Sequence, residues 1–283
     1  MPTYRRLDQA LSARNFGSRK EVHALVRAGL VLVNGMTAHS AGQKIDLEQD
    51  QVTVRGEEVR LQEFIYIMLH KPRGVISAAR DPKIPTVIDL LPAHLVRRGL
   101  FPVGHLDKDT TGLLLLTDDG ALAHALLSPR RHVPKAYHVT LRDPATEADI
   151  EAFAAGLRLP PAEGHPPEDC LPAELFILEL PPALASPAGA ACATPLASEG
   201  GYTARVVLRE GKYHQIKRMF SLRGNRVLAL HRESMGSLKL DKELGPGVCR
   251  ELTAGEVAGL RESPPHRLRA ELPQGGAEDV FSP

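Results

Sequence analysis

The chain has 283 residues, a formal net charge of +1, 43% hydrophobic residues and 4% aromatic residues. This length is sufficient for two domains with an aliphatic core, and the overall charge gives no sign of nucleic-acid binding. Three scattered cysteines exclude a disulfide framework and a thiolate metal site. Neither a secretory signal nor an apolar run of membrane length is present, so we expect a cytoplasmic protein with no membrane partner.

Residues 1–60 predict a separate small domain of two helices and a small sheet. Ser18-Arg19-Lys20-Glu21 has the form of a capping box at the start of the second helix, and Gly29 ends that helix. The Asn34-Gly35 pair indicates a hairpin turn between short strands. The apolar helix positions are Leu7, Ala10 and Leu11 and then Val22, Leu25 and Val26, and the expected strands cover residues 30–33 and 51–55.

Basic residues are concentrated in two segments of this otherwise neutral chain, residues 4–30 and residues 205–239. Clustered Lys and Arg side chains are typical of contacts to RNA phosphates, although a solvent-exposed helix face carries the same charges. In the first segment we expect Arg6, Arg19 and Lys20 to contact RNA. The N-terminal domain is therefore predicted to be a small α/β RNA-binding domain.

Residues 61–64 are the expected linker, and residues 65–262 predict a second domain. Its strands and helices do not alternate strictly, which favours an α+β fold with a mixed, mostly antiparallel sheet and flanking helices over a doubly wound one. Residues 181–200, rich in Ala, Pro, Ser and Gly, predict a flexible insertion, and residues 263–283 predict a disordered tail. The expected strands are residues 65–69, 113–116, 136–141, 173–180, 202–209 and 226–230, and the expected helices are residues 121–127, 147–155, 214–222 and 254–261.

A carboxylate lies at the mouth of one predicted buried strand. Asp107 is on a turn bracketed by Gly104 and Gly112, and this turn leads directly into the leucine run of residues 113–116. An acid in such a place is held still and partly desolvated, which suits a nucleophile or an acid–base catalyst. An aspartate that only caps the turn would have the same local sequence.

Two further segments carry residues with the chemistry of a catalytic site. Tyr137 lies in the alternating pattern of a strand, where its ring either packs across the sheet or stacks on a nucleic-acid base. His214, Lys217 and Arg218 lie at helical positions i, i+3 and i+4, so they share one face. That face would bind RNA phosphates or hold a carboxylate ionised, and a solvated helix face is the alternative.

Taken together, these motifs resemble those of the RsuA family of pseudouridine synthases, and the resemblance covers about residues 5–261. The N-terminal domain is similar to the small RNA-binding domain shared with ribosomal protein S-four, through its Arg6-Leu7-Asp8 and Val33-Asn34-Gly35 segments. Each catalytic-domain motif is weak alone, but four of them occur in the family order. They are Lys71-Pro72 with Gly74, Gly104 with Leu106-Asp107 and Asp109-Thr110-Thr111-Gly112, Lys135 with Tyr137, and Gly211 with Tyr213-His214-Gln215-Ile216-Lys217-Arg218-Met219.

The resemblance implies an enzyme that isomerises uridine to pseudouridine in rRNA and needs neither a cofactor nor a metal. It makes Asp107 the catalytic carboxylate, Tyr137 the tyrosine that stacks on the base, and Lys217 the cation that pairs with Asp107. It places Ile216 under the uracil and Lys71 beneath the site as a support. The other substrate-binding candidates are His105, His214, Gln215 and Arg218.

The chain departs from the family at His105, which stands where Arg usually precedes the Leu-Asp pair, and at His70, which stands where Asn is usual. The resemblance implies that this Arg helps to open the RNA stack, so His105 is expected to affect RNA engagement more than the chemistry. Residues 109–112 and 128–132 resemble the small-subunit enzymes of the family more than the large-subunit ones, which implies small-subunit (16S) rRNA as the substrate, with large-subunit (23S) rRNA as the alternative. We expect the enzyme to be a monomer. A non-catalytic RNA-binding factor of ribosome assembly is a further hypothesis. The sequence leaves open whether Asp107 attacks C1′ or C6 of the uridine or assists a glycal route.

Overall fold

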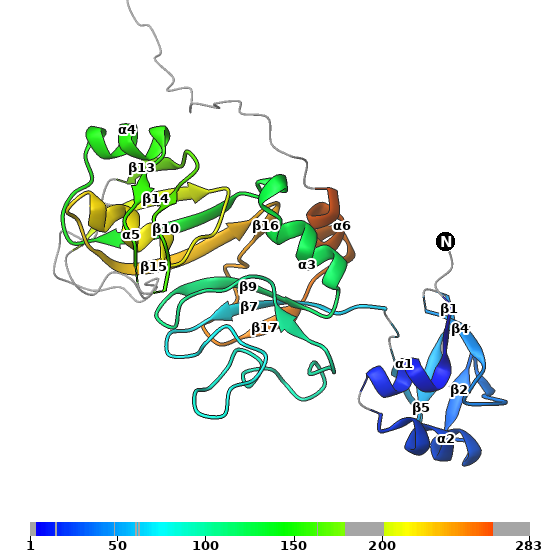
Figure 1. Ribbon diagram of the computed structural model, residues 1–283. Coiled ribbons are helices and arrows are strands. Elements are labelled where there is room, and N and C mark those ends of the chain that lie inside the picture. Colours follow the sequence, from blue (N-terminus) through cyan, green and yellow to red (C-terminus); the bar gives the residue numbers. More distant parts are fainter. Residues whose placement is uncertain are drawn as a thin grey trace, which may run out of the picture.

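The chain forms two parts, each with its own hydrophobic packing, which lie side by side in the computed structural model (Figure 1). The core of the N-terminal part draws on residues 7–61, and the packing of the second part draws on residues 65–260. The predicted insertion at residues 181–200 and the predicted tail at residues 263–283 lie outside the described residues. The structure describes residues 4–178 and 201–262, apart from residues 15, 48, 60, 62 and 163.

Two helices pack on a small antiparallel sheet in the N-terminal part. The Glu21 amide donates to Ser18 Oγ over 3.3 Å and the Ser18 amide donates to Glu21 Oε2 over 2.6 Å, which confirms the predicted capping box. Asn34 and Gly35 have φ values of 53° and 77°, as the predicted hairpin turn requires. Leu61, the first residue of the predicted linker, is 6% exposed and packs in this core. The helices are α1 (Leu7–Ala13) and α2 (Arg19–Arg27), the sheet runs β3 (Met36–Thr37), β2 (Val31–Val33), β5 (Val52–Val54) and β6 (Glu57–Val59), and β1 (Tyr4–Arg6) pairs with β4 (Lys44–Asp46).

A mixed sheet forms the centre of the second part (Figure 1). Its strands run in the order β13 (Glu174–Leu178), β14 (Tyr202–Leu208), β10 (Lys135–Leu141), β15 (Val227–Met235), β9 (Thr111–Thr117), β7 (Tyr66–Lys71) and β17 (Cys249–Glu251). β15 and β9 are parallel, and every other pairing described in this sheet is antiparallel, which confirms the predicted mixed, mostly antiparallel sheet. The remaining elements are β8 (Phe101–Pro102), α3 (Gly120–Leu127), a 3-10 turn (Pro129–Arg131), α4 (Glu147–Ala155), β11 (Arg158–Leu159), β12 (Glu168–Asp169), α5 (Gln215–Leu222), β16 (Leu238–Lys239) and α6 (Ala254–Glu262). None of the described helices has the length and apolarity needed to cross a membrane.

Strand β9 is buried on both faces, as its leucine run predicts. Leu114 and Leu116 pack in the core that includes residues of α4 and α5, and Leu113 and Leu115 pack in the core that includes residues of α3 and α6. All four leucines are fully buried. The turn that carries Asp107 is therefore attached to a strand that is fixed from both sides.

Two of the predicted boundaries that the structure corrects are those of β15 and α5. The strand expected over residues 226–230 continues as β15 to Met235, because it pairs with both β10 and β9, and the polar residues after Leu230 conceal this extension. The helix expected from His214 begins at Gln215, since His214 has a left-handed φ of 46°. The sequence pattern also misses strands of two or three residues such as β1 and β17, which are too short to show a period of two.

Candidate active site

The turn that carries Asp107 is held from beneath by a lysine. Lys71, at the end of β7, is 0% exposed, and its Nζ donates to the carbonyl oxygens of Asp107 (3.0 Å), Thr110 (2.9 Å) and Pro72 (3.1 Å). Burial lowers the pKa of Lys71 to about 8, against the attraction of the Asp109 and Asp107 carboxylates. Lys71 thus occupies a supporting position, and its ammonium binds the backbone of the turn.

Ser77 and Gly112 fix the same turn at two further positions, Leu106 and the start of β9. Ser77 Oγ donates to the Leu106 carbonyl oxygen (2.9 Å) and accepts from the Leu106 amide (3.1 Å), a role that no sequence motif signals. Gly112 ends the turn with a φ of 104°, and a Cβ there would lie 2.3 Å from the carbonyl oxygen of Arg232 on β15. Both its backbone conformation and the close approach of β15 therefore require glycine at this position.

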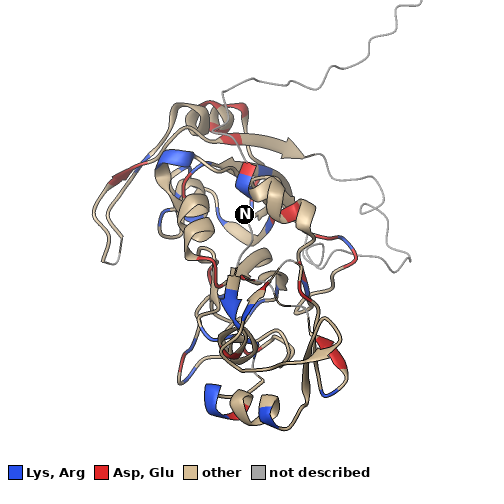
Figure 2. Ribbon diagram, turned by 90° about the vertical axis from the view of Figure 1, so that its right-hand side faces the viewer, with Lys and Arg blue, Asp and Glu red and all other residues tan. Residues whose placement is uncertain are grey.

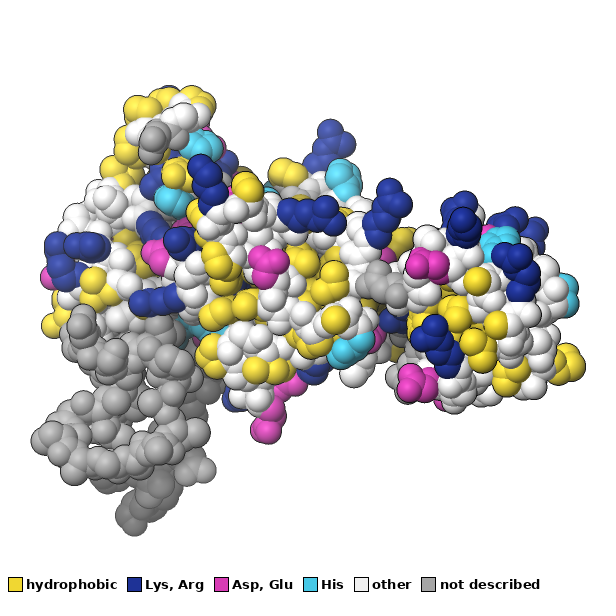
Figure 3. Space-filling view, turned by 90° about the horizontal axis from the view of Figure 1, so that it is seen from below, with side chains coloured by type: hydrophobic (Ala, Val, Ile, Leu, Met, Phe, Trp, Pro, Cys, Tyr) yellow, Lys and Arg dark blue, Asp and Glu magenta, His cyan; other side chains and the backbone are white. Residues whose placement is uncertain are grey.

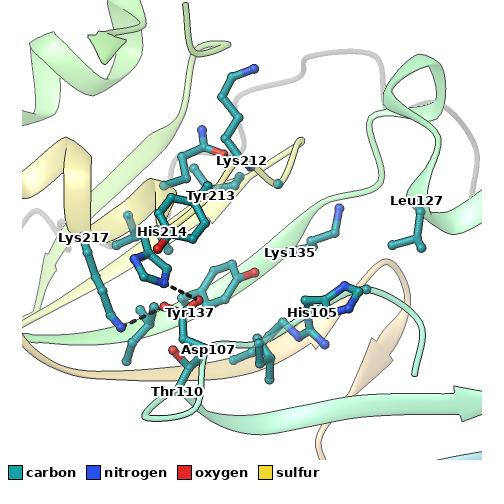
Figure 4. Close-up of a pocket in the computed structure, with 18 residues that line it drawn as sticks. His105, Asp107, Thr110, Leu127, Lys135, Tyr137, Lys212, Tyr213, His214 and Lys217 are labelled. Carbon is teal, nitrogen blue, oxygen red and sulfur yellow. Dashed lines mark hydrogen bonds and ion pairs between the residues drawn. The ribbon is translucent and has the colours of Figure 1, made fainter. Parts of the chain in front are cut away.

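The carboxylate of Asp107 lies beside His214, which precedes α5, and Lys217, which lies in the first turn of α5 (Figure 4). Lys217 Nζ is 2.8 Å from Asp107 Oδ2, and His214 Nε2 is 3.5 Å from Asp107 Oδ1. Lys217 also donates to Asp109 Oδ1 over 2.7 Å. Burial lowers the pKa of Lys217, but its hydrogen bonds to the two carboxylates outweigh burial, so the pKa is raised and the ammonium stays charged.

His214 reaches the carboxylate because it precedes α5 and does not lie in the helix. Its left-handed backbone conformation sets it apart from the helical residues that follow. The His214 ring stacks on Tyr213, with 3.9 Å between the ring centroids, and Tyr213 stacks on His165 at 4.3 Å. This stack of three rings holds His214 beside Asp107. His165 has no sequence signal, since it lies far from the motif in the chain.

A cavity of about 420 Å³ lies beside Asp107, within the size range of small-molecule sites. Tyr137 and Ile216 line it and are 8% and 3% exposed, so they form walls that offer an aromatic and an aliphatic surface. The Asp107 side chain is only 24% exposed and lines the same cavity. Within the described part of the chain, no group of three or more His, Cys, Asp or Glu side chains is placed to hold a metal ion. The arrangement can hold a planar base beside a carboxylate.

Residues 65–222 match the RNA pseudouridylate synthase family, and residues 5–52 match the S4 domain. The chain belongs to the RNA pseudouridylate synthase family. This pseudouridine synthase is 42% identical over 257 residues to an uncharacterised RNA pseudouridine synthase of Bacillus subtilis, with 91% of this chain and 98% of the relative covered. It is 37% identical over 258 residues to ribosomal small subunit pseudouridine synthase A of Yersinia pestis, with 90% and 97% covered. The Escherichia coli protein of the same name is 36% identical over 256 residues, with 90% and 99% covered.

The comparison of folds agrees with this assignment. A crystal structure of a pseudouridylate synthase superposes on this pseudouridine synthase with a TM-score of 0.57 at 34% sequence identity, and the match covers 90% of this chain and 99% of that chain. The RsuA family, the fold class and the enzyme class predicted from the sequence are thereby confirmed.

Arg218 does not join the Asp107 site of this pseudouridine synthase. Its guanidinium donates to Glu168 Oε2 (3.0 Å) and to the Pro160 carbonyl oxygen (2.7 Å), so it fastens α5 to β12 and to the end of β11. The sequence predicts that Arg218 shares one helix face with His214 and Lys217. The structure separates them, because His214 lies before the helix and Arg218 is engaged by these other acceptors.

Two other predicted substrate-binding residues of the pseudouridine synthase line the cavity. Gln215 is 4% exposed, and its side chain donates to Glu210 Oε1 (2.6 Å) and accepts from the Lys212 amide (3.0 Å), so it shapes the turn before α5. His105 is exposed and lines the cavity two positions before Asp107 in the chain (Figure 4). Of these two side chains, Gln215 is buried and His105 is exposed at the cavity.

The three candidates in the N-terminal part lie outside the cavity of the pseudouridine synthase. Arg6 donates to Asp8 Oδ2 over 2.8 Å, and this hydrogen bond lowers the pKa of Asp8 to about 2, against the effect of burial. Arg19 and Lys20 are exposed at the start of α2. Arg6 therefore has a structural partner, whereas Arg19 and Lys20 face solvent.

Proposed function

We propose that this enzyme isomerises one or very few uridines of small-subunit (16S) rRNA to pseudouridine, as a cytoplasmic monomer that uses no cofactor. The observation that carries the proposal is the 2.8 Å ion pair of Asp107 and Lys217 beside a cavity large enough for a pyrimidine. The choice of the small subunit is supported by relatives at 36–37% identity that are named for it. Large-subunit (23S) rRNA is the alternative substrate.

Asp107 is the reactive carboxylate of this proposal. The isomerisation breaks the N1–C1′ bond of uridine and forms a C5–C1′ bond, with no net transfer of electrons and no consumption of water. The Lys217 ammonium at 2.8 Å compensates the charge of the carboxylate, whose side chain is 24% exposed. His214, at 3.5 Å from the other carboxylate oxygen, fixes the second side of the group.

Tyr137 and Ile216 keep the detached base in place while it turns. The base presents N1 to the sugar before the reaction and C5 after it, so it must rotate without leaving the cavity. An aromatic surface and an aliphatic surface allow this rotation because neither depends on one hydrogen-bonding pattern. The Tyr137 hydroxyl is our candidate for removing the C5 proton.

The N-terminal domain supplies RNA contacts in this proposal. α2, at the bottom of Figure 2, carries Arg19 and Lys20 at its start and Arg27 at its end, and all three are exposed. Figure 3 shows Lys and Arg side chains along one side of this domain, at the right of the view. Phosphate contacts made here would help to supply the few kcal/mol that extrusion of a nucleotide from a stacked helix requires.

Mapping of pseudouridines in rRNA from cells with and without the gene tests the proposal. We expect one small-subunit site to disappear, to return with the wild-type gene, and not to return with Asp107→Asn, which keeps the shape of the side chain and removes its charge. Purified Asp107→Asn should bind rRNA within a few-fold of the wild type, so that lost activity is separated from lost binding. A site lost from large-subunit rRNA would favour the alternative, and unchanged rRNA would refute the proposal.

A further inference from the structure

Two buried cations line the cavity on strands β10 and β15. Lys135 is 8% exposed and Arg232 is 1% exposed. Lys135 Nζ donates to the Val133 carbonyl oxygen (3.2 Å), and Arg232 Nε donates to the Leu113 carbonyl oxygen (2.8 Å). Arg232 Nη2 is buried without a hydrogen-bond partner among the described residues. A buried charge is costly unless an opposite charge or a full set of hydrogen bonds compensates it, so this pair calls for a partner.

Glu210 is the carboxylate that acts on the pKa of Lys135, and it already has two other partners. Glu210 pairs with Lys212 Nζ (3.1 Å) and accepts a hydrogen bond from Gln215 Nε2 (2.6 Å). Burial, and then the like charge of Arg232, lower the pKa of Lys135 to about 8, and Glu210 opposes this only in part. Positive charge in this part of the cavity is therefore left for a ligand to compensate.

Strand geometry places these cations beside the proposed base-stacking tyrosine. Lys135 and Tyr137 are two residues apart on β10, so they share one face of the sheet, and Tyr137 is the cross-strand partner of Arg232 on β15. Figure 4 shows Lys135 and Asp107 on opposite sides of the Tyr137 ring. A base that lies on Tyr137 with its sugar at Asp107 would direct its far edge toward the two cations.

We propose that Lys135 and Arg232 form an anion site for the uracil as it departs from C1′, an inference that rests on the proposed function. Heterolysis of the N1–C1′ bond leaves the bonding electron pair on the base, and the negative charge spreads to its carbonyl oxygens. The negative charge is neutralised when C5 of the base bonds to C1′. The C5 proton then leaves and N1 gains a proton. Cationic donors already aimed at this charge lower the barrier to departure, because they bind the anion more strongly than the neutral nucleoside.

The depth of the two cations favours the base over a phosphate as the group they bind. A flipped nucleotide enters an enzyme base first, while its phosphodiester oxygens stay with the RNA backbone outside. Arg232 is 1% exposed and Lys135 is 8% exposed, whereas Arg19 and Lys20 on α2 lie on the surface, where phosphates are accessible. The enzyme therefore has one set of cations for phosphates and another for the base.

Binding of free bases to the full-length enzyme at neutral pH tests this site. The probes are uracil, which is neutral, and 5-nitrouracil, a planar analogue that ionises below neutral pH. We expect the wild type to bind the anion at least about tenfold more tightly, the effect of one charge-assisted hydrogen bond in a buried site. Lys135→Met should lose most of this preference and keep its affinity for uracil within a few-fold, and Lys135→Arg should retain the preference. Lys108→Met, at an exposed lysine, is the matched control.

The outcomes separate this site from the proposed function because the assay needs no RNA. Equal affinity of the wild type for the two bases, or no measurable binding of 5-nitrouracil, would overturn the inference. Displacement of 5-nitrouracil by inorganic phosphate as effectively as by uracil would overturn the assignment to the base. A preference that depends on Lys135, in an enzyme that modifies no rRNA, would refute the function alone. If Lys135→Met does not fold, Lys135→Arg becomes the test. A Lys135→Arg enzyme that keeps its affinity for uracil but no longer prefers the 5-nitrouracil anion would count against the site.

Discussion

Lys71 offers a direct test of how the catalytic turn is held. Lys71→Met keeps the length of the side chain and removes its charge and its donors. The carbonyl oxygens of Thr110 and Pro72 then lose a donor at 2.9 and 3.1 Å, and each acceptor left unsatisfied costs about 1–3 kcal/mol. The Asp107 carbonyl oxygen loses Lys71 but keeps the Thr110 amide as a donor at 3.1 Å. Against this, the fall of the pKa of Lys71 from 10.5 to about 8 corresponds to about 3 kcal/mol of burial cost that Met avoids. We therefore expect a net loss of about 1 kcal/mol in the free energy of unfolding.

Activity of the Lys71→Met variant should fall further than its fraction of folded protein. A displacement of the Asp107 carboxylate by about 1 Å costs on the order of 100-fold in rate, because the carboxylate must meet the sugar in one geometry. Urea titration gives the free energy of unfolding, and single-turnover kinetics with excess enzyme give the rate of the chemical step. Lys108→Met, the same substitution at an exposed lysine of the same turn, should resemble the wild type in both assays.

The pH dependence of stability gives an independent check on Lys71. The native ammonium loses its proton near pH 8, whereas an unfolded lysine does so near 10.5, so the unfolded state binds more protons between these values. Stability from this group therefore rises with pH in that interval. Lys71→Met should lack the contribution of Lys71 to this rise in stability. The contribution of Lys135, whose pKa is also about 8, should remain. A variant with the wild-type single-turnover rate, or with an unchanged slope of stability between about pH 8 and 10.5, would refute the reasoning.

Three further variants test other parts of the molecule. Gly112→Ala should lower the free energy of unfolding in urea by more than about 3 kcal/mol, since its Cβ would lie 2.3 Å from the Arg232 carbonyl oxygen; a loss below about 1 kcal/mol would contradict the close approach of the strands. Arg19→Gln combined with Lys20→Gln should weaken rRNA binding and reduce the salt slope of log affinity by about 1 to 2, and an unchanged slope would remove both residues from the RNA interface. His105→Arg should preserve or raise the rate at subsaturating rRNA, and a collapse of that rate would show that His105 has a role of its own.

The parts of the site that could be predicted from the sequence are those with local motifs. Asp107 lies on a turn bracketed by glycines before a leucine strand, and that arrangement is visible without any long-range contact. The alternating apolar pattern around Tyr137 predicts its strand, and the capping box of α2 is a local motif of four residues. The pairing of Asp107 with Lys217 joins distant segments, and only the family resemblance indicates it before the structure is seen.

The features that escape prediction depend on contacts between distant segments. Arg232 lies in a stretch of β15 whose polar residues give no strand signal, and it becomes part of the cavity only because β10 and β9 flank that strand. Ser77 and His165 act on residues far away in the chain, Leu106 and Tyr213, so no spacing marks them. In each case the tertiary fold, and not local propensity, decides the role of the side chain.

The parallel contact of β9 with β15 also determines when a newly made copy becomes competent. Gly112 meets Arg232 across this contact, and the Lys217 segment lies between them in the chain. During translation, the turn with Asp107 emerges well before the strand against which it must settle, and such distant pairing forms late. A nascent chain therefore cannot complete its catalytic turn until β15 has left the exit tunnel.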